Sequence, residues 1–246
     1  MPPAEWLKHG VGSPEMLAYL WLALENRRTM VVCGPSESGK TTTWDILCQF
    51  VPPRFRTERI EARDGEDLPA QMRAALEKKP DYLLVQEVQG EAAHLAFQAM
   101  NEGHGVLTVV QFPDVKAMVN GLEEPPASIP RALFTALNIL VLQNPVTVGG
   151  SKTRRVTKVV EFVAYEEKTN EIITNQAYGW DAGTDSFEPA EHSFVLEVLA
   201  ETKKVTLGEI DADLKGRTEV LADMLANGIT DPAEVARILG AYPPGG

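Results

Sequence analysis

Apolar runs and amphipathic segments alternate along the first 150 residues. Four runs are continuously apolar and have the length of strands that are buried on both faces. They lie at 29–33, 82–85, 106–110 and 139–142. The segments around them place apolar residues at helical spacing, and the helices expected there cover 41–50, 68–78, 91–101 and 115–122. Strands that alternate with helices predict an α/β fold with a parallel sheet and right-handed crossovers.

Another helix is expected ahead of the first strand. Ser13 is a suitable N-cap, Pro14 fits the first turn, and Glu15 lies near the positive end of the helix. The apolar pattern that follows predicts that this helix ends at about Glu25.

The pattern changes after Pro145. Two β-rich segments, 156–165 and 171–178, are joined by a polar turn and predict a β-hairpin. The side chains expected in its interior, in an alternation that the sequence leaves open, are Val159, Phe162, Ile172 and Ile173.

The rest of the chain has helical spacing. Helices are expected at 193–202 and 207–227, and a third is capped by Asp231. A loop is expected at 63–67 and a disordered tail at 243–246. We divide the chain into a nucleotide-binding core at 1–150, a β-hairpin extension at 151–190 and a small C-terminal helical subdomain at 191–246.

A phosphate-loop motif follows the first predicted strand. Residues Gly34-Pro35-Ser36-Glu37-Ser38-Gly39-Lys40-Thr41 fit the pattern G-x-x-x-x-G-K-[ST] without a mismatch. A predicted strand precedes them and a predicted helix follows, which is the context that this motif requires. The sequence therefore predicts a binding site for a nucleoside triphosphate.

Each residue type in this loop has a chemical reason. Gly34 and Gly39 permit backbone conformations that are closed to other residues, so that backbone N–H groups can surround the β- and γ-phosphates. Lys40 is expected to neutralise phosphate oxygens, and the Thr41 hydroxyl to hold Mg²⁺. Thr42 is expected in the helix near the α-phosphate.

Composition and charge exclude some classes of protein. The chain has 44% hydrophobic and 24% charged residues, and no apolar run approaches the roughly 18 residues that span a bilayer. The N-terminus lacks the regions of a signal peptide, so we expect a cytoplasmic protein. A net charge of −12 argues against a surface for nucleic acid, and no nucleic-acid partner is expected.

Two clusters of basic residues stand out against this negative charge. They consist of Arg54, Arg56 and Arg59, and of Lys152, Arg154 and Arg155. Solvated surface, a subunit contact and a reach toward a neighbour's phosphates are all compatible with such clusters. Cys33 and Cys48 have the surroundings of buried thiols in a cytoplasmic protein.

Several motifs in order along the chain resemble the secretion ATPases of type II and type IV systems, in the archaeal branch that drives archaella and pili. The matching segments are the helix at 13–21, the phosphate loop, the Walker B stretch at 79–91 (KPDYLLVQEVQGE), the segment at 97–104, the hairpin and the C-terminal helices. The resemblance covers nearly the whole chain. It implies a RecA-like P-loop NTPase fold that binds ATP and Mg²⁺, a hexameric ring with sites between neighbours, and a membrane platform protein as partner.

The resemblance also implies roles for single residues. Glu87 matches the acid that orients and polarises the attacking water, and it would act with Lys40 and Thr41. Glu61 weakly resembles the acidic box of the family and is a second candidate for the Mg²⁺ site. Gln111 stands where the family has a histidine and is a candidate sensor of the γ-phosphate, since an amide both donates and accepts hydrogen bonds.

The departures from the family concern the same site. The family usually carries Gly at the place of Gln86 and Arg at the place of Gln89. The segment between Glu61 and Asp81 looks shortened, and we expect the N-terminal domain that usually covers the site to be absent. Arginines at the γ-phosphate can contribute about 10³ to 10⁵ in rate, so low ATPase activity is expected.

Two functions therefore remain open. The first is an ATP-hydrolysing motor subunit of a secretion, pilus or archaellum system, in a ring that reaches the membrane through partners. The second is a hydrolysis-deficient, nucleotide-binding regulatory or structural subunit that partners a complete ATPase. An unrelated small-molecule kinase is disfavoured because the chain has no evident arginine-bearing lid.

Overall fold

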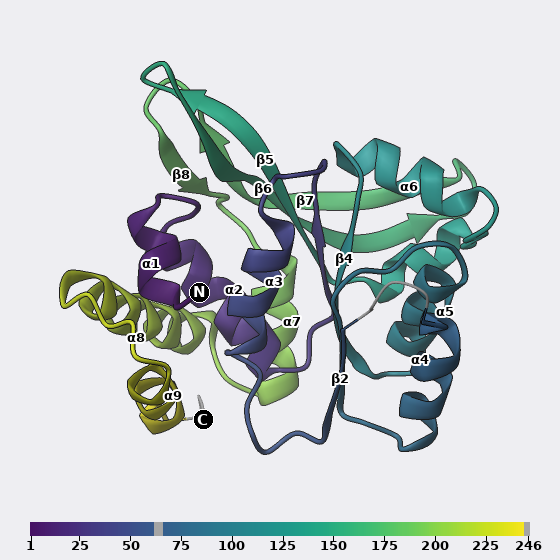
Figure 1. Ribbon diagram of the computed structural model, residues 1–246, viewed down its shortest axis with the longest axis horizontal. Coiled ribbons are helices and arrows are strands. Elements are labelled where there is room, and N and C mark those ends of the chain that lie inside the picture. The colour runs from purple at the N-terminus through teal and green to yellow at the C-terminus, as the bar shows by residue number, and fades with distance from the viewer. Residues whose placement is uncertain (62–65, 244–246) are drawn as a thin grey trace.

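The computed structural model describes residues 1–61 and 66–243 (Figure 1). The strands are β1 (Met30–Cys33), β2 (Thr57–Ile60), β3 (Tyr82–Val85), β4 (Gly105–Val110), β5 (Ile139–Val148), β6 (Ser151–Glu166), β7 (Glu171–Asp181) and β8 (Ser186–Pro189). The helices are α1 (Pro3–Lys8), α2 (Pro14–Glu25), α3 (Lys40–Cys48), α4 (Leu68–Glu77), α5 (Gly90–Asn101), α6 (Val115–Glu123), α7 (Phe194–Lys203), α8 (Leu207–Ala226) and α9 (Pro232–Ala241), with a 3₁₀ helix η1 (Arg131–Ala136). Within this described part, the strands form one eight-stranded sheet in the order β2-β3-β4-β1-β5-β6-β7-β8.

The first five strands of the sheet run parallel. β1 pairs with β4 on one side and with β5 on the other, and β2 and β3 extend the sheet beyond β4. Every residue of β1, β3 and β4 is buried, which explains why their sequences are continuously apolar. Because the carboxyl ends of parallel strands meet at one edge of a sheet, the segments that follow β1, β3 and β4 come together there.

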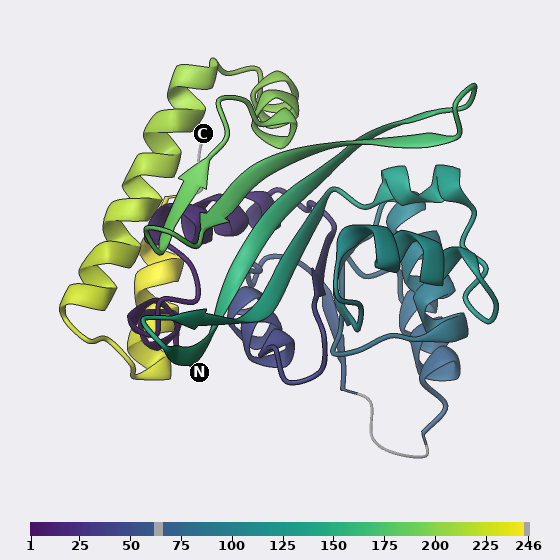
Figure 2. The same ribbon diagram turned by 90° about the horizontal axis from the view of Figure 1, so that it is seen from above.

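Two separate hydrophobic cores cover the two faces of the sheet. Met30 and Val32 of β1 pack with α1, α2, α3 and the C-terminal helices. Val31 and Cys33 point the other way and pack with α4, α5 and α6. Figure 2 shows these two groups of helices on opposite sides of the sheet. Among the described residues, none of the helices combines the length and the apolar character needed to cross a bilayer.

Long antiparallel strands continue the sheet on the other side of β5. β5 pairs with β6, β6 with β7, and β7 with β8. The predicted hairpin is confirmed, with Val159 and Phe162 buried and Ile172 partly buried. Ile173 was expected in the interior, and this expectation is wrong, because its side chain is 46% exposed. Consecutive strand residues point to opposite faces, so Ile172 and Ile173 cannot both face the core.

The three C-terminal helices begin at capping side chains, and the cap predicted at Asp231 is confirmed. The Asp231 carboxylate accepts a hydrogen bond from the Glu234 backbone N–H, and Ser193 accepts one from Leu196. Thr206 and Glu209 form a reciprocal capping box at the start of α8. Figure 2 shows α8 and α9 along one side of the molecule, beside the N-terminal helices.

The expected fold class is confirmed, with a mostly parallel α/β sheet, a hairpin and a helical C-terminal part. Four short elements, α1, β2, β8 and the 3₁₀ helix η1, were not predicted. β5 is longer than expected because it continues past Pro145 as the partner of β6. The division of the chain into three parts stays a prediction. The loop expected at 63–67 and the tail expected at 243–246 lie largely outside the described residues.

Candidate functional site

The phosphate loop joins β1 to α3 at the carboxyl edge of the parallel strands. Gly39 is the N-cap of α3 with φ +90°, a conformation that favours glycine. At Gly34 the reason for glycine is space, since a Cβ there would lie 2.1 Å from the backbone oxygen of Gln143. Both glycines of the motif are therefore required by the backbone path of the loop.

Three side chains donate hydrogen bonds to carbonyl groups of the loop. Lys40 Nζ donates to the Pro35 oxygen at 2.6 Å, Arg154 Nε to the Glu37 oxygen at 2.8 Å, and Gln143 Nε2 to the Ser38 oxygen at 2.7 Å. Carbonyl oxygens repel an anion, whereas backbone N–H groups attract it. Fixing these oxygens on donors favours a phosphate in the loop.

Ser38 supplies a second sign that the loop fits a ligand. Its side chain is fully buried, and among the described residues its hydroxyl has no hydrogen-bond partner. A buried hydroxyl without a partner is costly in a folded protein. The cradle and its unused donor fit a phosphate group.

Lys40 is 6% exposed. Burial lowers the pKa of its ammonium group, and the negative charge of Glu87 acts in the opposite direction. Glu87 follows β3, which is separated from β1 by the single strand β4, and it is close enough to influence Lys40 electrostatically. A cation and a carboxylate thus face the carboxyl edge of the sheet together.

The two altered Walker B positions lie beside Glu87. Gln89 Nε2 donates to Glu87 Oε1 at 3.3 Å, and Gln86 donates its backbone N–H to the Ile60 oxygen. An amide at Gln89 therefore contacts the carboxylate itself. Asp81, at the start of β3, is engaged elsewhere, because its carboxylate accepts from the backbone and the side chain of Arg56.

The other predicted site residues follow different strands of the sheet, some next to β1 and one at the edge of the sheet. Thr41 is exposed in the first turn of α3, and Thr42 is partly exposed beside it. Gln111 is exposed directly after β4, the strand next to β1. Glu61 follows β2 at the edge of the sheet, where it forms an ion pair with Arg59 at 2.8 Å. Of these residues, Glu61 is separated from β1 by two strands and has a cationic partner already.

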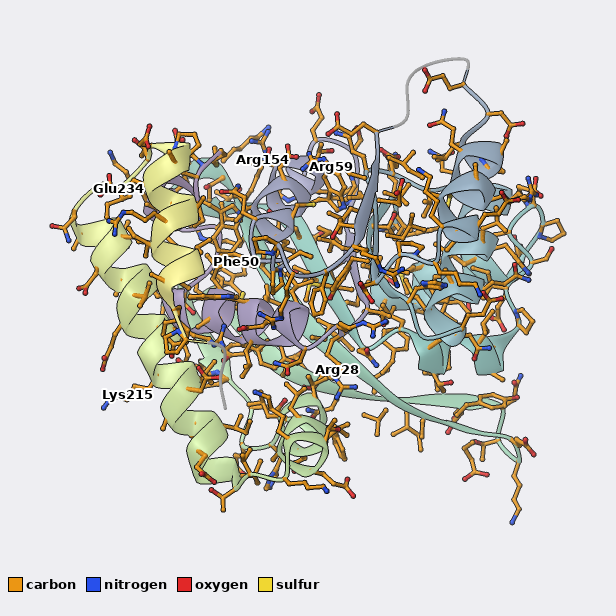
Figure 3. The ribbon with its side chains drawn as sticks, turned by 90° about the horizontal axis from the view of Figure 1, so that it is seen from below. Arg28, Phe50, Arg59, Arg154, Lys215 and Glu234 are labelled. Carbon is orange, nitrogen blue, oxygen red and sulfur yellow. The ribbon has the colours of Figure 1, made fainter. Side chains whose placement is uncertain are left out.

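A cavity of about 560 Å³ adjoins the phosphate loop on the side of α1 and of the β5–β6 hairpin. Its lining includes Gly39 of the loop and Thr42 of α3, together with Trp6, Lys152 and Arg154. Figure 3 shows Arg154 and Arg59 beside α3, while Lys215 lies on a distant part of α8. The volume and the adjacent loop are suited to the nucleoside part of a nucleotide.

Sequence reasoning did not identify Trp6 or Gln143 as site residues. Neither belongs to a motif. Gln143 contacts the loop from β5, and Trp6 of α1 contacts Thr43 in α3, the helix that follows the loop. Arg154 belonged to a basic cluster with several possible roles, and it contacts the phosphate loop of its own chain. Its neighbour Arg155 is buried and forms an ion pair with Asp185 at 2.8 Å, which lowers the pKa of that carboxyl to about 2.

The cluster at Arg54, Arg56 and Arg59 is paired within the chain. Arg54 lies 3.4 Å from Glu25, and Arg56 lies 3.3 Å from Asp81. Arg59 pairs with Asp45 at 2.7 Å and also lies over the ring of Trp44. These contacts favour a role on the surface of the subunit itself.

Comparison with known proteins agrees with these features. A family model described as "Type II/IV secretion system protein" matches residues 4–176. The uncharacterized protein MJ1287 of Methanocaldococcus jannaschii is 31% identical over 245 residues, covering 90% of this chain and 91% of that protein. The protein VirB11 of Rhizobium radiobacter is 26% identical over 161 residues, covering 52% of this chain and 47% of VirB11.

Among solved structures, the VirB11 ATPase from the Brucella suis type IV secretion system, in complex with sulphate, has a similar fold. The TM-score is 0.51 at 22% identity, with 58% of this chain and 51% of that chain covered. The chain thus spans about half the length of these VirB11 proteins. Since the family model covers most of the sequence, the chain belongs to the family of type II/IV secretion system proteins, within the secretion ATPase superfamily.

Proposed function

We propose that the chain binds ATP with Mg²⁺ at the phosphate loop and hydrolyses it as a motor subunit of a secretion, pilus or archaellum system. The observation that most directly supports this is the phosphate loop itself, which enters α3 through the left-handed Gly39 and has its Glu37 and Ser38 carbonyls held by Arg154 and Gln143. Family membership supports the same conclusion.

The residues present have the chemistry that phosphoryl transfer requires. The loop N–H groups and Lys40 would hold the phosphates, and the Thr41 hydroxyl would contribute an oxygen ligand to Mg²⁺, the kind of ligand that this ion prefers. The bound ion would draw negative charge from the phosphate oxygens. Glu87 would orient a water molecule and accept its proton, while Gln111 would contact the γ-phosphate. Lys40 must leave the Pro35 oxygen for this role, and a phosphate compensates for that lost contact.

The test combines ATP binding with steady-state hydrolysis on the purified protein. Lys40→Ala should weaken binding at least about tenfold, because a charge-assisted contact is lost. Glu87→Gln should keep binding and lower turnover by about 10² to 10⁴, the usual contribution of a general base. Lys215→Ala removes an exposed lysine of α8 and is the matched control. Equal turnover in the wild type and in Glu87→Gln, with binding intact, removes the catalytic role of Glu87.

A second candidate function is supported by the amides around Glu87. Gln89 and Gln111 are neutral where the resembled family has Arg and His, so no cation at these two positions can stabilise the charge that develops on the phosphate, and Gln86 adds a third amide where the family has Gly. The chain would then be a nucleotide-binding regulatory or structural subunit that partners a complete ATPase. Tight ATP binding without measurable turnover at any protein concentration supports this candidate over the motor.

We also infer that the subunit works in a ring, expected to be a hexamer, in the cytoplasm and at the membrane through a platform protein. The support is the family and its VirB11 members, together with a site that is open on the cavity side. Light scattering with and without Mg²⁺–ATP tests the ring. A monomer under all nucleotide conditions contradicts it.

A further inference from the structure

A buried chain of hydrogen bonds connects α1 with the phosphate loop. Trp6 Nε1 donates to Thr43 Oγ1 at 2.8 Å, Thr43 Oγ1 donates to Gln143 Oε1 at 2.6 Å, and Gln143 Nε2 donates to the Ser38 oxygen at 2.7 Å. None of these four residues is more than 2% exposed. We call Trp6, Thr43 and Gln143 the relay.

The chemistry of the two ends fixes the direction of every bond in the relay. The indole of Trp6 can only donate, and the backbone oxygen of Ser38 can only accept. The Thr43 hydroxyl accepts from Trp6, so its own proton is free to go to Gln143 Oε1. This contact turns the NH₂ group of Gln143 toward Ser38. Loss of the donor at Trp6 therefore removes a constraint on the orientation of the amide that holds the loop.

The position of Gln143 makes the loop sensitive to that orientation. A Cβ at Gly34 would lie 2.1 Å from the Gln143 backbone oxygen, and a Cβ at Gly39 would lie 2.8 Å from Gln143 Nε2. Gln143 therefore packs closely against both glycines of the motif. The pairing of β5 with β6 shifts register between Leu142 and Gln143, and bulges of this kind redirect side chains next to active sites.

We propose that the relay makes the docking of α1 a determinant of the shape of the phosphate loop, with Gln143 as the positioning residue. Trp6 then influences the affinity for a triphosphate through Thr43 and Gln143. The inference deepens the proposed function and rests on it. Since coupling between two equilibria is reciprocal, a bound triphosphate also strengthens the docking of α1, which packs against α8.

The test measures the dissociation constants of two probes, Mg²⁺–ATP and Mg²⁺–tripolyphosphate, by calorimetry on the full chain. Trp6→Phe keeps the aromatic bulk and removes the donor, and Thr43→Val removes the hydroxyl at nearly constant volume. We expect each to weaken both probes about three- to tenfold, the effect of one lost hydrogen bond. Trp44→Phe is the matched control, because this buried indole also makes one hydrogen bond, to the Leu107 oxygen at 3.0 Å. It should leave both affinities unchanged.

A double-mutant cycle tests whether the residues act in series. Gln143→Met should weaken both probes, and Trp6→Phe should add no further loss in that background. Additive losses overturn the relay.

Three other outcomes would overturn the relay, each for a different reason. A loss for ATP with unchanged tripolyphosphate binding means that Trp6 contacts the nucleoside, and it overturns the relay. An equal loss in Trp44→Phe attributes the effect to general destabilisation and overturns it too. Failure of the wild type to bind either probe overturns the proposed function itself, and the relay with it.

Discussion

The backbone of the phosphate loop depends on glycine for two different reasons. Gly39 needs its positive φ and also lies against Gln143 and Arg154. Gly103 has nearly the same φ, +89°, but no atom lies within 4 Å of a Cβ built there. A Cβ at Gly103 would therefore cause only conformational strain, whereas a Cβ at Gly39 would cause the same strain and also a steric collision.

Alanine at these two positions should have different effects. Gly103→Ala should lower the free energy of unfolding by about 1–2 kcal/mol, the strain of a left-handed residue, and leave nucleotide binding unchanged. Gly39→Ala should lose more stability and should also lose triphosphate binding, because its Cβ displaces the side chains that hold the loop. Urea unfolding and calorimetry measure both quantities. Equal stability losses, with ATP still bound by Gly39→Ala, contradict this account.

The two thiols make the free energy of unfolding depend on pH in the alkaline range. Cys33 is buried as expected, whereas Cys48 is only partly buried, against the expectation that both are buried. Reduced access to water raises the pKa of each thiol to about 12. A thiol in the unfolded chain has a pKa near 8.5, so at higher pH the unfolded state loses protons that the folded state keeps. The free energy of unfolding should therefore fall from about pH 8.5 upward, by about 2 kcal/mol per thiol at pH 10.

Urea unfolding of the wild type and of Cys33→Ala at pH 7.5 and 10 measures this contribution. The variant should lose less stability between the two pH values, whatever its stability at pH 7.5. Parallel losses in the two proteins would show that the pKa of Cys33 is the same in the folded and in the unfolded chain.

Local sequence predicts only part of the site at the scale of residues. Lys40, Thr41 and the two glycines could be named because they lie within one motif. Gln143 and Arg154 contact the loop from positions 105 and 117 residues away from their acceptors. Whether they reach it depends on the register of β5 and β6, including the shift at Gln143. No periodicity in the sequence encodes that shift.

At the scale of elements, burial on both faces made the central strands predictable. β1, β3 and β4 are continuously apolar because helices cover both sides. β2 has a mostly exposed, charged sequence at the edge of the sheet, and so its pattern carries no strand signal. α1 has six residues, fewer than the periodic pattern of a helix needs.

The carboxylate of one residue in β6 accepts hydrogen bonds from three other elements. Glu161 of β6 is fully buried and accepts hydrogen bonds from Tyr19 of α2, Asn175 of β7, and Ser193 and the backbone at the start of α7. All its partners are donors, which a carboxylate can satisfy and an amide cannot.

Replacing this carboxylate should loosen the junction. Glu161→Gln should lower the free energy of unfolding by about 2–4 kcal/mol, because its NH₂ group would face other donors in a buried site. Glu171→Gln, on the exposed start of β7, is the control and should change stability by less than about 0.5 kcal/mol. Urea unfolding compares them. Equal stabilities would mean that the junction rearranges around the amide.

At the scale of the whole molecule, a buried cation holds the C-terminal helices against the N-terminal ones. Arg217 of α8 is fully buried, 2.5 Å from Glu25 of α2 and 3.0 Å from Asp213. Its guanidinium lies between the rings of Trp21 and Tyr242, at 4.6 and 4.7 Å from their centroids. One side chain of α8 thus contacts both α2 and Tyr242, the residue that follows α9. α8 also packs against α1, where the relay begins.

This arrangement predicts that removing Arg217 alone lowers the free energy of unfolding more than removing Arg217 and the charge of Glu25 together. Arg217→Met should lower the free energy of unfolding by about 3–5 kcal/mol, because Glu25 would remain buried with the half-exposed Arg54, 3.4 Å away, as its cationic contact. The double variant Glu25→Gln with Arg217→Met should recover part of that loss, since the buried charge of Glu25 is removed together with that of Arg217, while Asp213 keeps the hydrogen bond from the Tyr242 hydroxyl at 2.9 Å. Urea unfolding of the wild type, both single variants and the double variant forms the cycle. If the two losses simply add, the interaction between Glu25 and Arg217 contributes nothing, and the stacking of Arg217 between the aromatic rings must hold α8 in place.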